Sequence, residues 1–329
     1  MKSYQEYLKE AGNVHLAYYL EAADELDIKY TVLVRSLLAE FEYKKKYWHI
    51  INTVTPLTPS TSTTICKRKH LTNLVLKGNG LSVPNQENIS SPIDALKFFS
   101  KYKDIVIKPT QQLGGIGVTI LPQTEEQVLK AYEIALESSK AKTKDKVIGE
   151  EFIHGENYRF LVLGNTVIGV VRRKAAHIIG NSKNTIRELI MTKNEERKDS
   201  LLKPILIDNE VNLKLQRSKL DLESIPEEGE ELILRYNCNL TTGGSTQECM
   251  SEVHDYYKQV AIKAVKTVGA EFGGVDIIAK NISKPSKFAI NEINYNPGLR
   301  LHYKVNSGNV VKVAVPIMQY IKDKHINSK

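Results

Sequence analysis

The apolar positions of the chain change their spacing along its length, and each spacing predicts a different element. Leu8, Leu16, Leu20 and Ala23 fall roughly on one face of a helix, because residues three or four positions apart are neighbours on a helical surface. The segment 30–38 then alternates apolar and polar side chains, which is typical of a half-buried strand. The opening of the chain therefore predicts a small α/β unit.

A stretch rich in Thr, Pro and Ser at 53–64 interrupts this pattern and predicts the first domain boundary. A helix is expected next over 67–77, because Gly78 and Gly80 stop the helical pattern there. The elements predicted after it are a helix over 93–102 that follows Pro92, strands at 104–109 and 117–121, a helix over 125–140 and a strand at 146–152.

The second half of the chain opens with a hairpin signal. Apolar and polar residues alternate through 158–174 around Gly164 and Asn165, a pair suited to a tight turn. The segment 181–230 is polar and helical in character. The remaining predicted elements are a strand at 231–236, an amphipathic helix over 251–269, strands at 274–279 and 287–294, and a last helix over 307–322.

Length and composition set the class of protein. A chain of 329 residues exceeds the comfortable size of one core, so two or three subdomains around a shared cleft are expected. The residues are 41% hydrophobic and 26% charged, as in an ordinary soluble protein. No run approaches a membrane span, the first residues lack a secretory pattern, and the three cysteines form no CxxC pair. These features favour a cytoplasmic location.

The chain is basic, with 46 Lys and Arg against 38 Asp and Glu, a net charge of +8. Such a charge permits an anionic partner, but a lysine-rich solvated surface is the favoured explanation. The densest clusters, at 44–46 and 67–69, are short and have no aromatic-rich nucleic-acid motif beside them. A nucleic-acid binder remains a hypothesis that rests on net charge alone, and we expect no such partner.

Two neighbouring strands near the C-terminus carry polar residues with the chemistry of a metal site. Asp276 interrupts the apolar segment 274–279, and Glu292 with Asn294 interrupt 287–294. Alternation puts Glu292 and Asn294 on one face of their strand. Carboxylate and amide oxygens are hard ligands that suit Mg²⁺. The alternative, left open by the residues alone, is that these groups cap strand ends or pair with lysines.

Lys108 and a following glycine turn form a second candidate site. The lysine emerges from a buried strand, and Gly114, Gly115 and Gly117 follow it closely. A fixed ammonium group and exposed backbone N–H groups both suit phosphate oxygens. A hairpin turn alone would also explain the glycines, and neither the P-loop nor the Rossmann fingerprint is present.

Three further segments carry polar groups without a decisive pattern. The strand end that includes Glu150, Glu151, Phe152 and Ile153 suits a purine ring, with Asn157 or Glu156 near a ribose, or it is a domain hinge. The other two segments are the basic run Arg172, Arg173 and Lys174 with His177, and the loop 241–245, which contains Gly243, Gly244 and Ser245. We find no GxSxG and no HExxH, so neither nucleophilic nor zinc-protease chemistry is indicated.

Seven segments in this order resemble the ATP-grasp superfamily, from about residue 56 to residue 320. They are KHLTNLVLKGNGLSVP, VIKPTQQLGGIGV, VIGEEFIHGENYRFLVL, VVRRKAAHIIG, NCNLTTGGSTQE, FGGVDIIA and INEINYNPGL. The resemblance is greatest to the glutathione synthetase half of the bifunctional glutathione enzyme and to the ATP-grasp region of cyanophycin synthetase. It implies an α/β (α+β) ATP-grasp fold, in which two α+β subdomains grip ATP beside a small N-terminal α/β domain.

The domain boundaries that follow from the resemblance are 1–62 for an N-terminal α/β domain, 63–153 for a central ATP-grasp subdomain with the glycine-rich loop, and 154–329 for a C-terminal subdomain with the metal and substrate sites. The implied nucleotide-binding residues are Lys69, Lys108, Gly114, Gly115, Gly117, Glu150, Glu151, Phe152, Ile153 and Asn157. The implied metal ligands are Asp276, Glu292 and Asn294. The residues implied to line the acyl phosphate and the substrates are Arg173, His177, Arg235, Gly243, Gly244 and Ser245.

The sequence departs from the family pattern at three positions. Asn157 replaces an acidic ribose ligand, Arg68 precedes Lys69 where relatives usually have Asp, and Asn181 stands where they have Asp. The departures at Asn157 and Arg68 motivate an alternative function, a nucleotide-binding regulatory or interaction protein with little turnover.

The function that the resemblance implies is that of an ATP-dependent carboxylate–amine ligase, which forms an amide or peptide bond through an acyl phosphate. The expected cofactors are ATP and Mg²⁺, with Mn²⁺ as a substitute. The expected partners are small amino-acid or peptide substrates, with no nucleic acid and no membrane, and a homodimer is left open. Neither the carboxylate nor the amine can be identified from the sequence.

Overall fold

The computed structural model describes residues 2–111, 116–141, 145–199, 203–238 and 240–327. Helices and sheets are mixed in it, in agreement with the predicted α+β class. The chain divides into two compact units, which we call unit 1 (residues 1–171 and 248–329) and unit 2 (residues 172–247). The division into the three domains expected from the resemblance stays a prediction.

Unit 1 begins with two helices and a three-stranded antiparallel sheet of order β1-β2-β3. The elements are α1 (Tyr4–Ala11), α2 (Val14–Glu25), β1 (Lys29–Val34), β2 (Leu38–Tyr43) and β3 (Lys46–Ile51). The single strand predicted over 30–38 is therefore wrong in extent, because a turn at Ser36 divides it between two strands. The β2–β3 turn was missed, since Lys44 and Lys45 adopt the positive φ that Asn-Gly usually marks.

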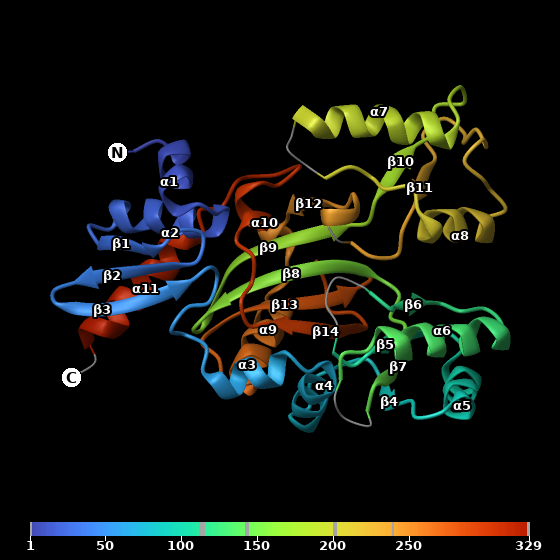
Figure 1. The fold of residues 1–329 in the computed structure, drawn as a ribbon, viewed down its shortest axis with the longest axis horizontal. Helices are drawn as coiled ribbons and strands as arrows, with labels where there is room; N and C mark the ends of the chain where they lie inside the picture. The colour runs from blue at the N-terminus through green and yellow to red at the C-terminus, as the bar shows by residue number, and fades with distance from the viewer. Residues whose placement is uncertain (1, 112–115, 142–144, 200–202, 239, 328–329) are drawn as a thin grey trace. The chain divides into compact units, whose positions relative to one another are not determined.

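The C-terminal helix α11 (Ala314–Asn327) packs against α2, so the two ends of the chain share one hydrophobic core (Figure 1). Tyr7, Leu16 and Phe41 from the N-terminal elements meet Ile317 and Ile321 in this core. The helix predicted over 307–322 begins later than expected, and a short helix, α10 (Arg300–Tyr303), precedes it.

The middle of unit 1 contains a four-stranded antiparallel sheet of order β4-β7-β5-β6. Its strands are β4 (Gln86–Asn88), β5 (Ile105–Pro109), β6 (Thr119–Ile120) and β7 (Val147–Glu151), and helices α5 (Pro92–Tyr102) and α6 (Glu125–Ser138) pack on them. Before this sheet lie α3 (Ser60–Cys66) and α4 (Lys69–Gly78). Helix α3 falls inside the Thr, Pro and Ser-rich stretch, where we expected only a boundary.

The largest sheet has five strands in the order β12-β9-β8-β13-β14. The strands are β8 (Glu156–Leu163), β9 (Thr166–Lys174), β12 (Ser245–Glu248), β13 (Phe272–Ala279) and β14 (Phe288–Asn294), and the helix α9 (Asp255–Thr267) packs on β8 and β13. A short 3-10 turn, η2 (Met250–Glu252), precedes that helix. The predicted hairpin and the predicted pair of C-terminal strands are both confirmed.

A β-bulge keeps apolar side chains on one face of the β13–β14 pair and polar side chains on the other face. Asp276 lies opposite Glu292, but the next pair is Ile277 with Ile290, so Asn291 is an extra residue. Directly opposite residues share a face, so Ile277 and Ile290 both join the core under α9. Without the extra residue, Ile290 would fall on the face of Glu292.

Unit 2 has its own hydrophobic core. A two-stranded antiparallel sheet forms from β10 (His177–Ile179) and β11 (Glu231–Ile233), and α7 (Ile186–Asp199), α8 (Asn209–Arg217) and the 3-10 turn η1 (Leu240–Thr242) accompany it. Ile178, Ile190, Val211 and Leu234 are buried together. The two helices confirm the helical character predicted for 181–230. Across the described part of the chain, none of the helices is long and apolar enough to span a membrane.

Candidate functional site

Three ion pairs in unit 1 contain five of the residues predicted to bind nucleotide or metal. They join Lys69 to Glu292, Lys108 to Glu150 and Arg159 to Asp276. The residues come from α4, from the four-stranded sheet and from the five-stranded sheet, so each pair joins segments that are distant in sequence. We call these six residues the charge cluster.

Arg159 and Asp276 form the most buried pair of the charge cluster. They lie opposite each other on β8 and β13, and both oxygens of the carboxylate accept hydrogen bonds, Oδ1 from Nε and Oδ2 from Nη2 at 2.9 Å. Burial alone lowers the pKa of the Arg159 guanidinium, but Asp276 and, to a smaller extent, Glu292 raise it overall. The pair is therefore fully charged inside the protein, with a bidentate geometry that fixes the carboxylate.

Gly274 makes room for this arrangement. A Cβ atom at position 274 would lie 3.0 Å from Cδ of Arg159 and 2.9 Å from Cβ of Pro297. Such approaches are closer than side chains tolerate. The absence of a side chain at Gly274 therefore allows the Arg159 side chain to lie along the sheet beside Asp276.

The predicted metal ligands share one face of the sheet. Asp276 is directly opposite Glu292, and Gly274 is directly opposite Asn294, which places all three polar side chains on the face away from α9. The buried Nδ2 of Asn294 has no hydrogen-bond partner among the residues that the structure describes. The two carboxylates and Oδ1 of Asn294 are a set of oxygen donors that fits a hard divalent cation.

This donor set contains two acids and one amide. Within the described ranges, no group of three or more His, Cys, Asp or Glu residues is arranged to hold a metal ion. A cation bound here would therefore need Asn294, water or a ligand oxygen to complete its coordination, which is how Mg²⁺ is usually held beside phosphates.

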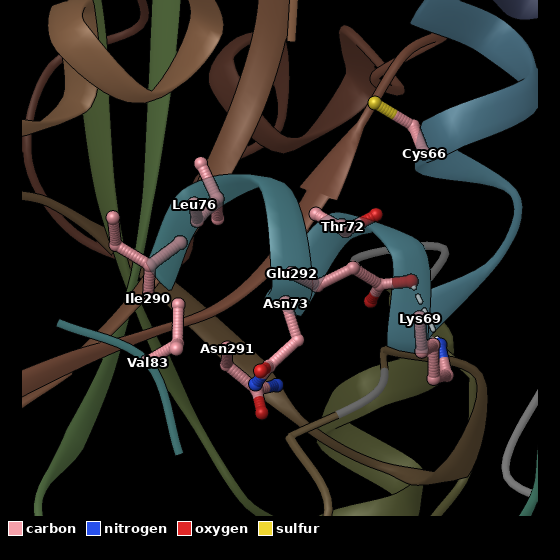
Figure 2. Close-up of a pocket in the computed structure, with 9 residues that line it drawn as sticks. All are labelled: Cys66, Lys69, Thr72, Asn73, Leu76, Val83, Ile290, Asn291 and Glu292. Atoms are coloured by element: carbon pink, nitrogen blue, oxygen red, sulfur yellow. Dashed lines mark hydrogen bonds and ion pairs between the residues drawn. The ribbon is translucent and has the colours of Figure 1, made fainter. Parts of the chain in front are cut away.

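Lys69 begins helix α4 and lines a pocket together with Glu292, to which a dashed line joins it in Figure 2. Its Nζ lies 3.0 Å from Oε1 of Glu292. Burial alone lowers the pKa of Lys69, but the charge of Glu292 and its hydrogen bond raise it overall, with smaller effects from Glu150 and Asp276. The charges of all three carboxylates therefore reach this ammonium group. The pocket is also lined by Asn291, the extra residue of the bulge.

Lys108 and Glu150 pair on neighbouring strands, β5 and β7. Nζ of Lys108 donates to Oε1 of Glu150 at 2.6 Å, and Nε2 of Gln86 donates to the other carboxylate oxygen. Both charged residues are buried. Lys108, which was predicted to bind phosphate, thus lies beside Glu150, which belongs to the segment predicted to bind adenine.

The rest of that segment is held mainly through its backbone. The N–H of Glu151 donates to the carbonyl of Asn85 at 2.9 Å, and the N–H of Phe152 donates to the carbonyl of Asp104 at 2.9 Å. Ile153 follows and is partly exposed. Asn157 lies on β8 opposite Ile278, two positions before Arg159. The adenine and ribose roles of these residues stay predictions.

The predicted phosphate loop is described only in part. Gly114 and Gly115 lie outside the described residues, and Gly117 is in the turn before β6. Arg68, one of the three departures from the family pattern, is the residue before α4, and its side chain makes no capping hydrogen bond.

Arg235 is the central charge of unit 2. Its side chain is 2% exposed, and its guanidinium is held by Asp208 and by Glu210, the latter at 2.6 Å, and by the carbonyl of Leu206 at 3.1 Å. An acyl phosphate would have to compete with these two carboxylates. Nε of Arg235 is buried without a hydrogen-bond partner in the described part of the chain, and the catalytic role of the residue stays a prediction.

The loop that contains Gly244 and Ser245 is held by Arg197, on helix α7. Arg197 donates from Nε to the carbonyl of Lys203 at 2.7 Å and from Nη2 to the carbonyl of Gly244 at 2.9 Å. Gly243 has a φ of 100° and packs so closely on Ile205 that a Cβ would lie 2.8 Å from its Cα. This position requires glycine, and Ser245 then begins β12.

The remaining predicted residues of unit 2 lie on or beside β9 and β10. Arg173 is half-buried near the end of β9. Nδ1 of His177 lies 2.9 Å from the carbonyl of Ala175, and its Nε2 lies 3.8 Å from Glu231. Asn181 accepts the N–H of Asn184 at 2.9 Å. An Asp side chain could accept the same bond, so the departure at 181 preserves the local turn.

Two functional candidates were missed from the sequence. Arg159 lies in the predicted strand segment 158–174, and Arg197 lies in the polar segment 181–230, but neither is among the predicted site residues. A lone arginine within the apolar run YRFLVL was the available signal for the first, because an unpaired charge in a buried strand is costly. Nothing in the spacing of α7 distinguishes Arg197 from its solvated neighbours.

Comparison with known proteins gives a consistent set of relatives, although no family model matches the chain. The glutathione biosynthesis bifunctional protein GshAB of Clostridium perfringens is 36% identical over 253 residues, which is 72% of this chain and 32% of that protein. Cyanophycin synthetase of Crocosphaera subtropica is 33% identical over 267 residues, which is 77% of this chain and 30% of that protein. The chain thus spans about a third of the length of the curated relatives it matches.

A solved structure supports the same relationship. The bifunctional glutathione synthetase of Pasteurella multocida matches with a TM-score of 0.66 and 27% identity, over 94% of this chain and 44% of that chain. The resemblance inferred from the ordered segments is confirmed. The chain is therefore homologous to the glutathione biosynthesis bifunctional proteins and to cyanophycin synthetase, and it has the α+β ATP-grasp fold that its sequence predicts.

Proposed function

We propose that the protein is an ATP-dependent carboxylate–amine ligase that forms an amide or peptide bond. The observation that carries this proposal is the charge cluster. Its three short ion pairs include two lysines predicted to bind phosphate, Lys69 and Lys108, and two carboxylates predicted to bind metal, Asp276 and Glu292. The homologues support it, because their names are those of enzymes that make glutathione and cyanophycin. They favour turnover over a purely regulatory, nucleotide-binding role.

In the proposed reaction, the γ-phosphate of ATP is transferred to a substrate carboxylate with release of ADP, and an amine then attacks the acyl phosphate and displaces inorganic phosphate. The Lys69 and Lys108 ammonium groups would hold phosphate oxygens, and the strand end from Glu150 to Ile153 would hold the adenine. Such a site accelerates phosphoryl transfer mainly by positioning the reactants and neutralising charge. No covalent protein intermediate is needed, which agrees with the absence of a nucleophile motif in the sequence.

Asp276, Glu292 and Asn294 would hold a divalent cation, which we propose to be Mg²⁺. When bound, such an ion supplies electrostatic neutralisation of the phosphate oxygens. Arg159 holds the Asp276 carboxylate in a fixed orientation for this role. In unit 2, Arg173, Arg235, Gly244 and Ser245 would line the substrates.

The substrates that we propose are an amino acid or small peptide as the carboxylate and an amino acid as the amine, in line with the names of the relatives. A cytoplasmic location and the three-domain division belong to the same proposal. Since this chain matches only about a third of the length of these relatives, their complete activities are not assumed for it.

The direct test is phosphate release from ATP in the presence of Mg²⁺ and a panel of amino acids and short peptides, followed by mass spectrometry of the products. Glu292→Gln should abolish release while leaving the circular dichroism spectrum unchanged. A matched control is Glu87→Gln, which breaks a solvent-exposed pair with Lys101 and should keep full activity.

Silence of the native protein across a broad panel would count against ligase function. Near-normal activity of the Glu292→Gln variant would instead remove the metal assignment and leave the ligase proposal standing.

A further inference from the structure

The three pairs of the charge cluster differ in how far solvent reaches them. The side chains of Arg159 and Asp276 are 8% and 3% exposed, and the pair in the four-stranded sheet is similarly closed. The side chains of Lys69 and Glu292 are 25% and 32% exposed. Opening a buried pair leaves a charge without water, whereas an accessible pair contributes little and opens readily. Only the Lys69–Glu292 pair is therefore suited to exchange its partners.

Each member of this pair also has a ligand role that excludes the other member. The Lys69 ammonium is proposed to bind a phosphate oxygen, and the Glu292 carboxylate is proposed to bind a divalent cation. In the structure, the ammonium lies 3.0 Å from the carboxylate and occupies the space next to Oε1. A cation at that oxygen would meet the like charge of Lys69 at close range, which is unfavourable.

We infer that the Lys69–Glu292 pair is an exchange element: binding of the divalent cation to Glu292 releases Lys69, and the released ammonium then binds the phosphates of the nucleotide. This inference rests on the proposed function. The exchange itself requires only these two side chains to move. Because binding linkage is reciprocal, the cation and the nucleotide then strengthen each other's binding by the same factor.

The exchange is tested by the affinity for ADP of the native protein and of Lys69→Met, each measured by calorimetry in EDTA and in saturating Mn²⁺. In EDTA the lysine is already held by Glu292, so its removal should change ADP affinity less than about two-fold. In Mn²⁺ the lysine is released, so its removal should weaken ADP roughly five-fold or more, the size of a typical coupling between sites.

The same variant should bind Mn²⁺ more tightly than the native protein when no nucleotide is present, because a competing cation has been removed from Glu292. Electron paramagnetic resonance of free Mn²⁺ measures this directly. The matched control is Lys67→Met, which removes a positive charge two residues away that lies over the ring of Tyr295, 5.4 Å from its centroid. The control should tighten Mn²⁺ binding much less.

The carboxylate side of the pair gives an independent test. Glu292→Gln releases Lys69 without a metal, so it should strengthen ADP binding in EDTA. The gain should disappear in the double variant Lys69→Met/Glu292→Gln, because there is no longer a lysine to release. A general effect of removing negative charge would persist in the double variant.

If Lys69→Met weakens ADP binding by the same factor in EDTA and in Mn²⁺, the exchange is overturned while the ligase proposal stands. The same conclusion follows if the gain in ADP affinity of Glu292→Gln survives in the double variant. A native protein that binds neither ADP nor Mn²⁺ would overturn both proposals.

Discussion

Arg159 and Asp276 lie directly opposite each other on β8 and β13, and the guanidinium of the first binds both oxygens of the second. The pair stands at the centre of the face proposed to bind metal, because Asp276 is in turn opposite Glu292. Its burial makes it costly to disrupt, and its position connects the stability of the sheet to the geometry of the proposed site.

Replacement of Arg159 by Met should destabilise the protein by roughly 3–5 kcal/mol, because the Asp276 charge loses its buried partner. Urea unfolding followed by circular dichroism measures the loss. The double variant Arg159→Met/Asp276→Leu should recover a large part of it, since no buried charge remains. A cost below about 1 kcal/mol for the single variant would contradict the importance of the pair.

Arg68→Asp should stabilise the protein. Arg68 precedes helix α4 and its side chain makes no capping hydrogen bond, whereas Asp can accept one from the first turn and interacts favourably with the helix dipole. We expect a gain of about 0.5–2 kcal/mol in thermal or urea unfolding. Arg68→Ala is the control that separates loss of the positive charge from gain of the cap. Equal stability of the two variants would contradict the capping explanation.

The stability of the protein should fall on mild acidification, partly because of His302. This residue is 1% exposed, and neither ring nitrogen has a hydrogen-bond partner among the described residues. Burial and, to a smaller extent, the charge of Arg159 lower its pKa to about 3. Below the ordinary pKa of 6.5 the unfolded chain therefore binds a proton that the folded protein refuses, so stability decreases from about pH 6.5 towards pH 3.

The variant His302→Leu should lose less stability than the native protein between pH 7 and pH 5.5, with a difference of about 1 kcal/mol. Urea unfolding at several pH values measures this difference. Stability at pH 8 is the common reference, because the histidine is then neutral in both the folded and the unfolded protein. Parallel stability curves for the two proteins would show that His302 does not contribute.

Loss of Arg197 should loosen the loop that contains Gly244 without unfolding unit 2. Arg197→Met removes two hydrogen bonds to carbonyl groups, so we expect a loss of roughly 1–3 kcal/mol. Hydrogen exchange should become faster in residues 203–207 and 243–247. Lys198→Met, on the same helix but in a solvent-exposed pair with Glu195, should leave exchange unchanged. Equal exchange in both variants would argue against a role in holding the loop.

The sequence predicted the polar face of the β13–β14 pair, the proposed metal site, because the information is local. Glu292 and Asn294 are two positions apart on one strand, and alternation alone puts them on the same face. The positively charged side chains that pair with these carboxylates could not be predicted in this way. Lys69 and Glu292 are 223 positions apart, and Arg159 and Asp276 are 117 positions apart, so their pairing depends on how the sheets assemble.

Errors in the predicted elements have physical causes of the same kind. Helix α3 begins after Pro59 in a stretch of Ser and Thr, residues that favour turns when taken alone but that here pack through Ser62 and Cys66. The bulge at Asn291 was also missed, because a single extra residue has no signature beyond a break in the alternation of Ile290 and Glu292.

That extra residue makes the β13–β14 pair sensitive to chain length. If Asn291 were deleted, the strand could keep Ile290 in the core or Glu292 beside Asp276, but regular pairing would not allow both. Substitutions at this position should be tolerated far better than a one-residue deletion. Natural variation among close homologues is therefore expected to change the identity of this residue while conserving the number of residues between Ile290 and Glu292.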